Sequence, residues 1–372
     1  MKLSYLAHSK IPSKEANSVH VMKMCQALAV SGADVNLYIP EHNASSEDPF
    51  QFYGVKQVFS IKRKKWKRIT FGNFVYALKV VTELVREKEQ VVYGRDLVSC
   101  YVATLFGLRT IWEAHAPVQY MGKLYEWLFK RMTSRKNYIK TVVISSTLKE
   151  HFADTYGLNN NVVVLPDCSD AIDLDSVKPK FSNESSFKAN VGYIGQLYPG
   201  KGMEIISELV PLCPDIMFHI VGGVEKDVMY WQRHLSSCNN VVFHGFVKPS
   251  DTVSYGLAMD ILIAPYLSKV QGAGSKDFRK NISMWMSPLK IFEYMSYKKP
   301  IVCSDLQVIR DVLNNNNSIL CSPDNIDDWK NAVYLLANNK EEAQRISDNA
   351  YKDFINNYTW NHRAKSILEL YS

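Results

Sequence analysis

A chain of 372 residues with 47% hydrophobic and 22% charged side chains is typical of a globular protein, and at roughly 150 residues per domain it predicts two domains. The absence of a long apolar run or a signal peptide argues against export, and seven scattered cysteines, never spaced as C-x-x-C, argue against a disulfide framework or a zinc site. The net charge of +7 is uneven: residues 1–170 carry 23 Lys+Arg and 15 Asp+Glu, whereas the remainder carries 21 and 22, which predicts an anionic partner for the first half.

The first half alternates short apolar runs with helical patterns. An expected strand at 2–7 leads to a helix at 19–31, which Gly32 ends. Further strands are expected at 34–40, 55–61, 91–93, 110–112, 141–144 and 162–165. This order predicts a parallel sheet with helices on both faces.

A basic and aromatic segment lies at 61–68, IKRKKWKR, ahead of an apolar stretch with Phe71 and Phe74. Its candidate membrane-binding residues are Lys62, Arg63, Lys64, Lys65, Trp66, Lys67 and Arg68. The alternative is a solvated charged face, which we prefer for a second basic segment at 128–140. Tryptophan among cations is typical of interfacial elements, so 61–68 predicts contact with an anionic membrane surface. We find no nucleic-acid-binding motif and expect no nucleic-acid partner.

Residues 167–186 are rich in Asp, Ser, Lys and Pro and are predicted to form a linker. It contains Asp173-Leu174-Asp175, a D-x-D sequence that we interpret as a solvated loop and not a metal site. Beyond it the strand-helix order resumes, with strands expected at 189–194, 217–221, 241–243, 261–264, 300–303 and 319–321. Two doubly wound parallel sheets would bind ligands outside the carboxyl ends of their strands, in a cleft between the domains.

A glycine-bearing turn, GQLYPGKG at 195–202, follows a buried type of strand and precedes an amphipathic helix. Glycines permit close approach of a ligand, the helix N-terminus presents free N–H groups, and Lys201 adds a cation. Together they would hold a diphosphate, although such turns also occur without a ligand.

A second candidate is SPLKIFEYM at 287–295, where Ser287 suits the N-cap and Pro288 the first helical position. Lys290 and Glu293 then share one helix face. The cation suits phosphate oxygens, and the carboxylate could accept hydrogen bonds from both hydroxyls of a ribose. The alternative is an ordinary surface pair of Lys and Glu.

Residues 189–328 resemble the nucleotide-binding domain of the retaining GT-B glycosyltransferases of family 4 (glycosyl transferases group 1). The matching segments are VGYIGQLYPGKGMEII, FHIVGG, VVFHGFVKPSDTVSYGLAMDILIAPY and SPLKIFEYMSYKKPIVCSDLQVIRDVL. ANSVHVMKMCQALAVSGADV and IWEAHAP match more loosely in the first half, and the C-terminal FINNYTWNHRAKSILELY is similar to a helix that returns to the first domain.

The resemblance implies a donor site in the second domain and catalytic groups, His115 and Glu113, in the first. Lys201 would hold the diphosphate, Glu293 the ribose, and the loop 245–247 would lie beside the base. The donor-binding residues are expected to be Gly195, Gln196, Gly200, Lys201, Gly202, Phe246, Val247, Ser287, Pro288, Leu289, Lys290 and Glu293.

Two positions depart from the family pattern. Gln196 stands where the family often has Arg, and Trp285 stands where the first of two signature glutamates belongs. Either Asp277, Arg279 or backbone N–H groups of 281–287 would then replace the missing glutamate, or sugar recognition would differ from that of the family.

We therefore expect a GT-B-like α/β enzyme with an acceptor domain at 1–175, to which a helix at about 360–372 returns, and a donor domain at 176–359. It would transfer a sugar, with retention and without a metal or other cofactor, from a UDP- or GDP-sugar to a glycan or lipid-linked acceptor. The expected setting is surface-polysaccharide synthesis, of capsule or lipopolysaccharide, at the cytoplasmic face of the membrane. The alternatives are a nucleotide-sugar 2-epimerase of the same fold and a non-catalytic membrane-associated subunit.

Overall fold

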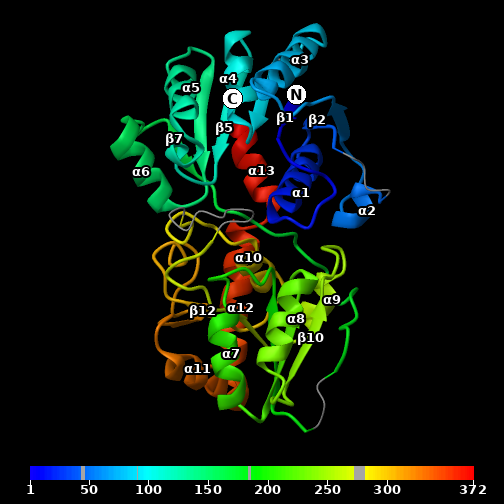
Figure 1. Ribbon diagram of the computed structural model, residues 1–372, viewed down its shortest axis with the longest axis vertical. Coiled ribbons are helices and arrows are strands. Elements are labelled where there is room, and N and C mark those ends of the chain that lie inside the picture. Colours follow the sequence, from blue (N-terminus) through cyan, green and yellow to red (C-terminus); the bar gives the residue numbers. More distant parts are fainter. Residues whose placement is uncertain (43–46, 90, 183–185, 272–280) are drawn as a thin grey trace. The chain divides into compact units, whose positions relative to one another are not determined.

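A computed structural model of the protein describes residues 1–42, 47–89, 91–182, 186–271 and 281–372. The chain divides into two compact units, which are described separately (Figure 1). Unit 1 comprises Met1–Pro166 and Trp360–Ser372, and unit 2 comprises Asp167–Thr359. Each unit is a parallel sheet covered by helices, as the sequence predicts.

Unit 1 has a sheet of seven parallel strands in the order β3-β2-β1-β4-β5-β6-β7. The strands are β1 (Lys2–Leu6), β2 (Asp34–Pro40), β3 (Ser60–Lys64), β4 (Val91–Gly94), β5 (Arg109–Ala114), β6 (Tyr138–Val143) and β7 (Val162–Val164). Strand β4 is buried at every position, because helices cover both faces of a parallel sheet. The strand order reverses between β1 and β4, which makes their carboxyl ends the switch point of this unit.

The helices of unit 1 are α1 (Ala16–Val30), α2 (Pro49–Tyr53), α3 (Gly72–Arg86), α4 (Leu97–Leu105), α5 (Lys123–Thr133), α6 (Ser146–Tyr156) and α13 (Trp360–Glu369), with a 3-10 turn, η1, at Val118–Met121. Helix α3 packs on α4, and α4 packs on α5 (Figure 1). The C-terminal helix α13 lies beside α1, so the end of the chain belongs to the first unit (Figure 1).

Unit 2 has a sheet of six parallel strands in the order β10-β9-β8-β11-β12-β13. They are β8 (Ala189–Ile194), β9 (Ile216–Val221), β10 (Val241–Gly245), β11 (Ile261–Ala264), β12 (Ile301–Ser304) and β13 (Ile319–Cys321). The helices are α7 (Met203–Leu212), α8 (Glu225–His234), α9 (Thr252–Leu257), α10 (Leu289–Ser296), α11 (Ile326–Asn338) and α12 (Lys340–Asn357). Here the order reverses between β8 and β11.

Two details differ from the sequence-based predictions. The third strand occupies Ser60–Lys64 and not 55–61. The boundary between the units follows Pro166 and not residue 175, because the start of the supposed linker is bonded to unit 2: the N–H of Asp167 donates to Ser287 Oγ at 2.9 Å, and the N–H of Ser169 donates to the carbonyl oxygen of Tyr358 at 3.1 Å. Of the helices in the described ranges, none has the length and hydropathy of a transmembrane span.

Candidate active site

The loop 195–202 leaves the sheet of unit 2 at its switch point, directly after β8. It leads into α7, which begins at Met203 as predicted. The Tyr193 hydroxyl donates to the carbonyl oxygens of Gln196 (2.7 Å) and Lys201 (3.1 Å), and so fastens both ends of the loop. The loop therefore occupies the position where open parallel sheets bind ligands.

Glycines allow the loops at these strand ends to approach one another. Gly200 has φ +80°, and a Cβ there would lie 2.1 Å from the carbonyl oxygen of Lys269. Gly222, after β9, has φ +115°, and its Cβ would lie 2.2 Å from the carbonyl oxygen of Gly195. A side chain at either position would force the backbone apart, so both glycines are required for the shape of this site.

Two lysines share an aromatic cage beside the loop. The Lys290 Nζ lies 3.6 Å from the Tyr193 ring centroid and 5.1 Å from that of Tyr266. The Lys201 Nζ lies 5.4 Å from the Tyr266 centroid. The Nζ of Lys290 has no hydrogen-bond partner among the described residues. The surface pair of Lys290 and Glu293 considered from the sequence is therefore wrong for Lys290, which is 8% exposed.

Burial lowers the pKa of Lys201 to about 8. Burial, with the nearby charge of Lys201, lowers the pKa of Lys290 well below its ordinary value. A ring face contributes about 2 kcal/mol to a desolvated cation, whereas taking an ion out of water costs several kcal/mol. The rings alone thus offset only part of the cost of charging either amine, and a bound diphosphate would supply the missing negative charge.

Helix α10 begins beside this cage without a side-chain cap. Pro288, and not Ser287, occupies its N-cap position, and Leu289 is its first residue. The predicted cap is wrong because the Ser287 Oγ accepts a hydrogen bond from the backbone N–H of Asp167, at 2.9 Å. The first N–H groups of α10 have no side-chain acceptor in the described part of the chain, and Glu293 follows in the second turn, partly buried.

The expected base-binding loop follows β10. Gly245 ends this strand with φ +66°, and its carbonyl oxygen accepts a hydrogen bond from the N–H of Gly222 at 2.7 Å. Phe246 and Val247 are partly buried beyond it. The expected donor loop 195–202 thus follows β8 and the loop 245–247 follows β10, and these two strands flank β9 in the sheet. Two alternatives for the missing glutamate, residues 277 and 279, lie outside the described residues.

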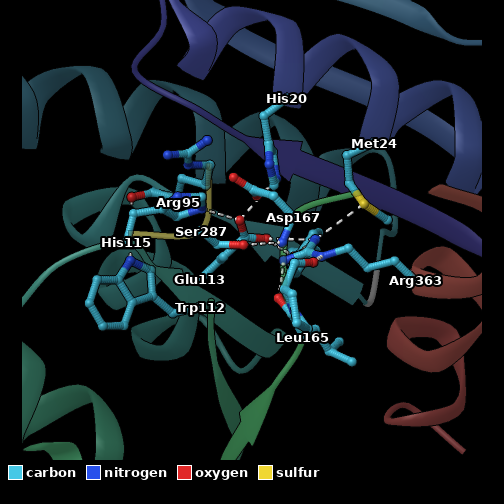
Figure 2. A network of polar contacts seen from close by, with 12 residues as sticks. His20, Met24, Arg95, Trp112, Glu113, His115, Leu165, Asp167, Ser287 and Arg363 are labelled. Atoms are coloured by element: carbon cyan, nitrogen blue, oxygen red, sulfur yellow. Dashed lines mark hydrogen bonds and ion pairs between the residues drawn. The ribbon is translucent and has the colours of Figure 1, made fainter. Parts of the chain in front are cut away.

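In unit 1, Glu113 on β5 is buried and His115 follows it, partly exposed. His115 Nε2 contacts Glu113 Oε1, so the two predicted catalytic residues are brought together. Figure 2 shows that His20 and Arg363 also point at this carboxylate, with His20 Nε2 at 2.9 Å from Oε1 and Arg363 Nη1 at 3.2 Å from Oε2. The Tyr93 hydroxyl donates to Oε2.

The charge at Glu113 is fixed by its neighbours. Burial alone would raise the pKa of Glu113, but Arg363 and His20, with a hydrogen bond from His115, hold it well below its ordinary value. Arg363 also donates from Nε to the carbonyl of Pro166 (2.9 Å) and from Nη2 to that of Leu165 (3.1 Å). Arg363 thereby joins α13 to β5 and holds the carboxylate that contacts His115.

Sequence reasoning missed Arg363, Tyr193 and Tyr266. A signal for Arg363 was present, because it falls in line with Trp360 and Ile367 on the buried face of α13, where an unpaired cation is not tolerated. Tyr193 in β8 and Tyr266 just after β11 look like ordinary core residues, and only their position around the lysines distinguishes them.

In the basic segment 61–68 of unit 1, several side chains that were predicted to bind a membrane are paired within the protein. Lys62 lies 3.3 Å from Glu87, which caps the C-terminus of α3, and Lys64 lies 2.5 Å from Glu83 of α3. Arg63 donates to the carbonyl of Ile11 at 2.9 Å.

Trp66 is also engaged, because its indole N–H donates to Asn73 Oδ1 at 2.9 Å. Lys65, Lys67 and Arg68 are exposed. They precede two apolar side chains that are also exposed, Ile69 (63%) and Phe71 (69%).

Two family descriptions match successive parts of the chain. Residues 18–171 match Glycosyltransferase Family 4, and residues 175–353 match Glycosyl transferases group 1. The two matches fall on unit 1 and unit 2 and together cover most of both.

Among curated proteins, the chain is similar to the phosphatidylinositol N-acetylglucosaminyltransferase GPI3 subunit of Saccharomyces cerevisiae strain YJM789, with 24% identity over 313 residues. The match covers 78% of this chain but 64% of that protein, so the chain spans less than two thirds of its relative.

Solved structures share the fold. Anabaena Alr3699/HepE in complex with UDP and glucose has a TM-score of 0.72 at 14% identity, covering 99% of this chain and 98% of that one. A glycosyltransferase from Rickettsia africae ESF-5 has a TM-score of 0.76 at 13% identity, covering 100% and 97%. The lipopolysaccharide outer core galactosyltransferase WaaB, in its apo form, has a TM-score of 0.66 at 16% identity, covering 100% and 99%.

Proposed function

Because this chain belongs to the family 4 (group 1) glycosyltransferases and has their GT-B fold, we propose that it transfers a sugar from a UDP-sugar to a lipid-linked or glycan acceptor. GDP-sugars are the second class of donor to test. The single observation that carries the donor assignment is the pair Lys201 and Lys290, held beside a strand-to-helix loop with too little counter-charge.

The chemistry of that pair favours a diphosphate. Two cations and the uncapped start of α10 present positive charge on one side of the loop 195–202. Glu293 would accept hydrogen bonds from the ribose hydroxyls, and Phe246 and Val247 would border the base. A structural neighbour that was crystallised with UDP and with UDP-glucose supports the choice of uridine nucleotides.

We assign transfer with retention of anomeric configuration. The bond between the sugar C1 and the phosphate oxygen would break while the acceptor oxygen bonds to C1 on the same face. The departing phosphate, stabilised by Lys201 and Lys290, would take the acceptor proton. The positive charge comes from the protein itself, so the proposal includes no metal.

The acceptor is proposed to be held at the cytoplasmic face of a membrane, in surface-polysaccharide assembly. One curated relative is named for transfer to phosphatidylinositol, and one structural neighbour for lipopolysaccharide. The part of unit 1 that would touch the membrane is narrower than the sequence predicted: Lys67, Arg68, Ile69 and Phe71. Phe71 has φ 61°, an unfavourable conformation for a bulky residue, yet its ring is exposed, which points to a functional placement.

Vesicle flotation tests the membrane contact. We expect stronger binding to anionic than to neutral vesicles, released by salt, and lost when Lys67 and Arg68 are changed to Gln. The matched control changes Lys62 and Lys64 to Gln, whose charges Glu87 and Glu83 already balance, and should bind nearly as the parent does. Equal binding to both kinds of vesicle would remove the membrane from the proposal.

Thermal-shift measurements with UDP-, GDP- and ADP-sugars test the donor. A ligand at about a hundred times its dissociation constant adds about 2.7 kcal/mol to the stability of the state it binds. We expect the melting temperature to rise with one class of nucleotide-sugar and not with the free sugar. No rise with any of them, at millimolar concentrations, would contradict the donor assignment.

A further inference from the structure

The amine of Lys290 lies against Gly195, the first residue of the loop 195–202. A Cβ built on Gly195 would lie 2.9 Å from Nζ, so the amine touches the backbone of this loop. Lys290 belongs to α10 and is buried together with Ile291 and Tyr294 of the same helix. Its side chain therefore does not extend its amine into water as surface lysines do. The amine therefore stays between the two tyrosine rings and the loop whether or not a ligand is present.

The groups that face Lys290 offer it rings and few charges. They are Tyr193 of β8, Lys201 of the loop, Tyr266 after β11, Glu293 of its own helix and Cys303 of β12. Both tyrosines are fully buried, and burial raises the pKa of each hydroxyl, so neither provides a negative charge. Glu204 of α7 lies near Tyr193, and its Oε1 accepts a hydrogen bond from the N–H of Gly200 at 2.8 Å, but its charge is not among those that shift the pKa of Lys290.

Within this set, Glu293 carries the one carboxyl group, and the cation of Lys201 opposes its effect on Lys290. Burial and the charge of Lys201 lower the pKa of Lys290, while Cys303 and Glu293 raise it by less. Among the described residues no anion lies between these two lysines, and two cations beside one loop favour release of one proton. A diphosphate placed there would reverse this balance, because each oxygen that contacts Nζ favours its charged form.

Resting on the proposed donor site, we propose that Lys290 is a neutral amine in the empty protein and is protonated when a nucleoside diphosphate occupies the loop 195–202, so that donor binding takes up a proton from solution. The proton leaves again with the diphosphate product. Lys290 then serves as a cation only in the occupied site, and it takes the place of the arginine that the family often has at the position of Gln196.

Calorimetry with UDP, and with GDP if UDP does not bind, tests this. Titrations at pH 8 in two buffers of different ionisation enthalpy give the number of protons taken up, at a pH where the nucleotide itself no longer titrates. We expect the parent to take up clearly more protons than Lys290→Met, in which an unbranched apolar side chain fills the cage. Between pH 7.5 and 9 the nucleotide affinity of the parent should fall more steeply than that of Lys290→Met. Uptake of one proton corresponds to a fall of up to about tenfold per pH unit.

The comparison with Lys290→Met separates Lys290 from Lys201, which titrates in the same range. Equal proton uptake by the parent and Lys290→Met would overturn the inference while leaving the donor site intact. Failure of the parent to bind either nucleotide would overturn both. Carbon-detected NMR of the lysine Cε signals provides a second test, with the Lys290 signal assigned by its loss in the Met variant. We expect this signal to change from that of a neutral amine to that of a charged amine on addition of UDP. A Lys290 signal that is already that of a charged amine in the empty protein at pH 8 would contradict the inference.

Discussion

Lys201→Met is expected to change stability and donor binding in opposite directions. Burial lowers the pKa of Lys201 from 10.5 to about 8. At neutral pH the charged amine is therefore less stable in the folded protein than in the unfolded chain, which lowers the free energy of unfolding. At about 1.4 kcal/mol per pKa unit, the charged form costs roughly 3 kcal/mol at pH 7, and partial exposure of the side chain reduces this to about 2 kcal/mol. Methionine removes the cost and keeps the apolar stem.

The sign follows from proton binding. The unfolded chain holds this proton up to about pH 10.5 and the folded chain up to about pH 8. The cost is therefore complete below pH 8 and fades as the pH rises toward 10.5. We expect Lys201→Met to raise the melting temperature of unit 2 by about 4–8 °C at pH 7, and by roughly half as much at pH 9.5.

Differential scanning fluorimetry at both pH values, with UDP titrated by calorimetry, provides the measurement. Lys226→Met, at an exposed position of α8 in the same unit, is the matched control and should change neither quantity. UDP affinity of Lys201→Met should fall by about 1.5–3 kcal/mol, as expected for a lost charge-assisted contact. If the variant is no more stable than the parent and binds UDP equally well, the charge of Lys201 neither destabilises the fold nor contributes to UDP binding, and the reasoning is refuted.

Three further outcomes are expected. Arg363→Met should destabilise unit 1 by about 3–5 kcal/mol in urea unfolding, because the buried carboxylate of Glu113 loses the guanidinium that contributes most to holding its charge; a loss below 1 kcal/mol would show that the pair is not structural. Glu293→Ala should weaken donor binding by about 1.5–3 kcal/mol with the melting temperature of the empty protein unchanged, and equal affinity would remove Glu293 from the site. Transfer should survive EDTA and give a product whose anomeric proton has the donor's configuration by NMR; a strict Mn²⁺ requirement that disappears with Asp173 and Asp175, or an inverted product, would contradict the proposed chemistry.

Sequence patterns identified the two sheets because fully buried parallel strands appear as continuous apolar runs. Strand β3 is the exception that shows the limit. It is an edge strand, SIKRK, whose lysines pair with Glu83 of α3 and with Glu87 at the end of that helix in place of burying apolar side chains. A pattern search for hydrophobic residues therefore placed this strand too early in the chain, at 55–61.

The donor loop was predictable from glycine spacing, because a turn from a strand into a helix is a local feature. The partner of Ser287 was not predictable: a serine before a proline suits a helix cap, but a backbone N–H of Asp167, distant in sequence, competes for its hydroxyl. The burial of Lys290 could have been inferred, since positions 290, 291, 294 and 295 form one buried face of α10. The domain boundary was displaced because composition does not reveal single anchors such as the hydrogen bond from the N–H of Ser169 to the carbonyl oxygen of Tyr358.

Mass spectrometry of lipids after incubation with a nucleotide-sugar measures sugar transfer itself. The protein would be supplied with each UDP- and GDP-sugar together with vesicles made from a bacterial lipid extract. We expect one donor to add a single sugar unit to a lipid-linked acceptor, with release of one equivalent of nucleoside diphosphate, and we expect Lys201→Ala to abolish the product. A donor that is bound and epimerised, or bound and left unchanged, with no sugar found on any acceptor, would contradict the assignment of this chain as an active glycosyltransferase.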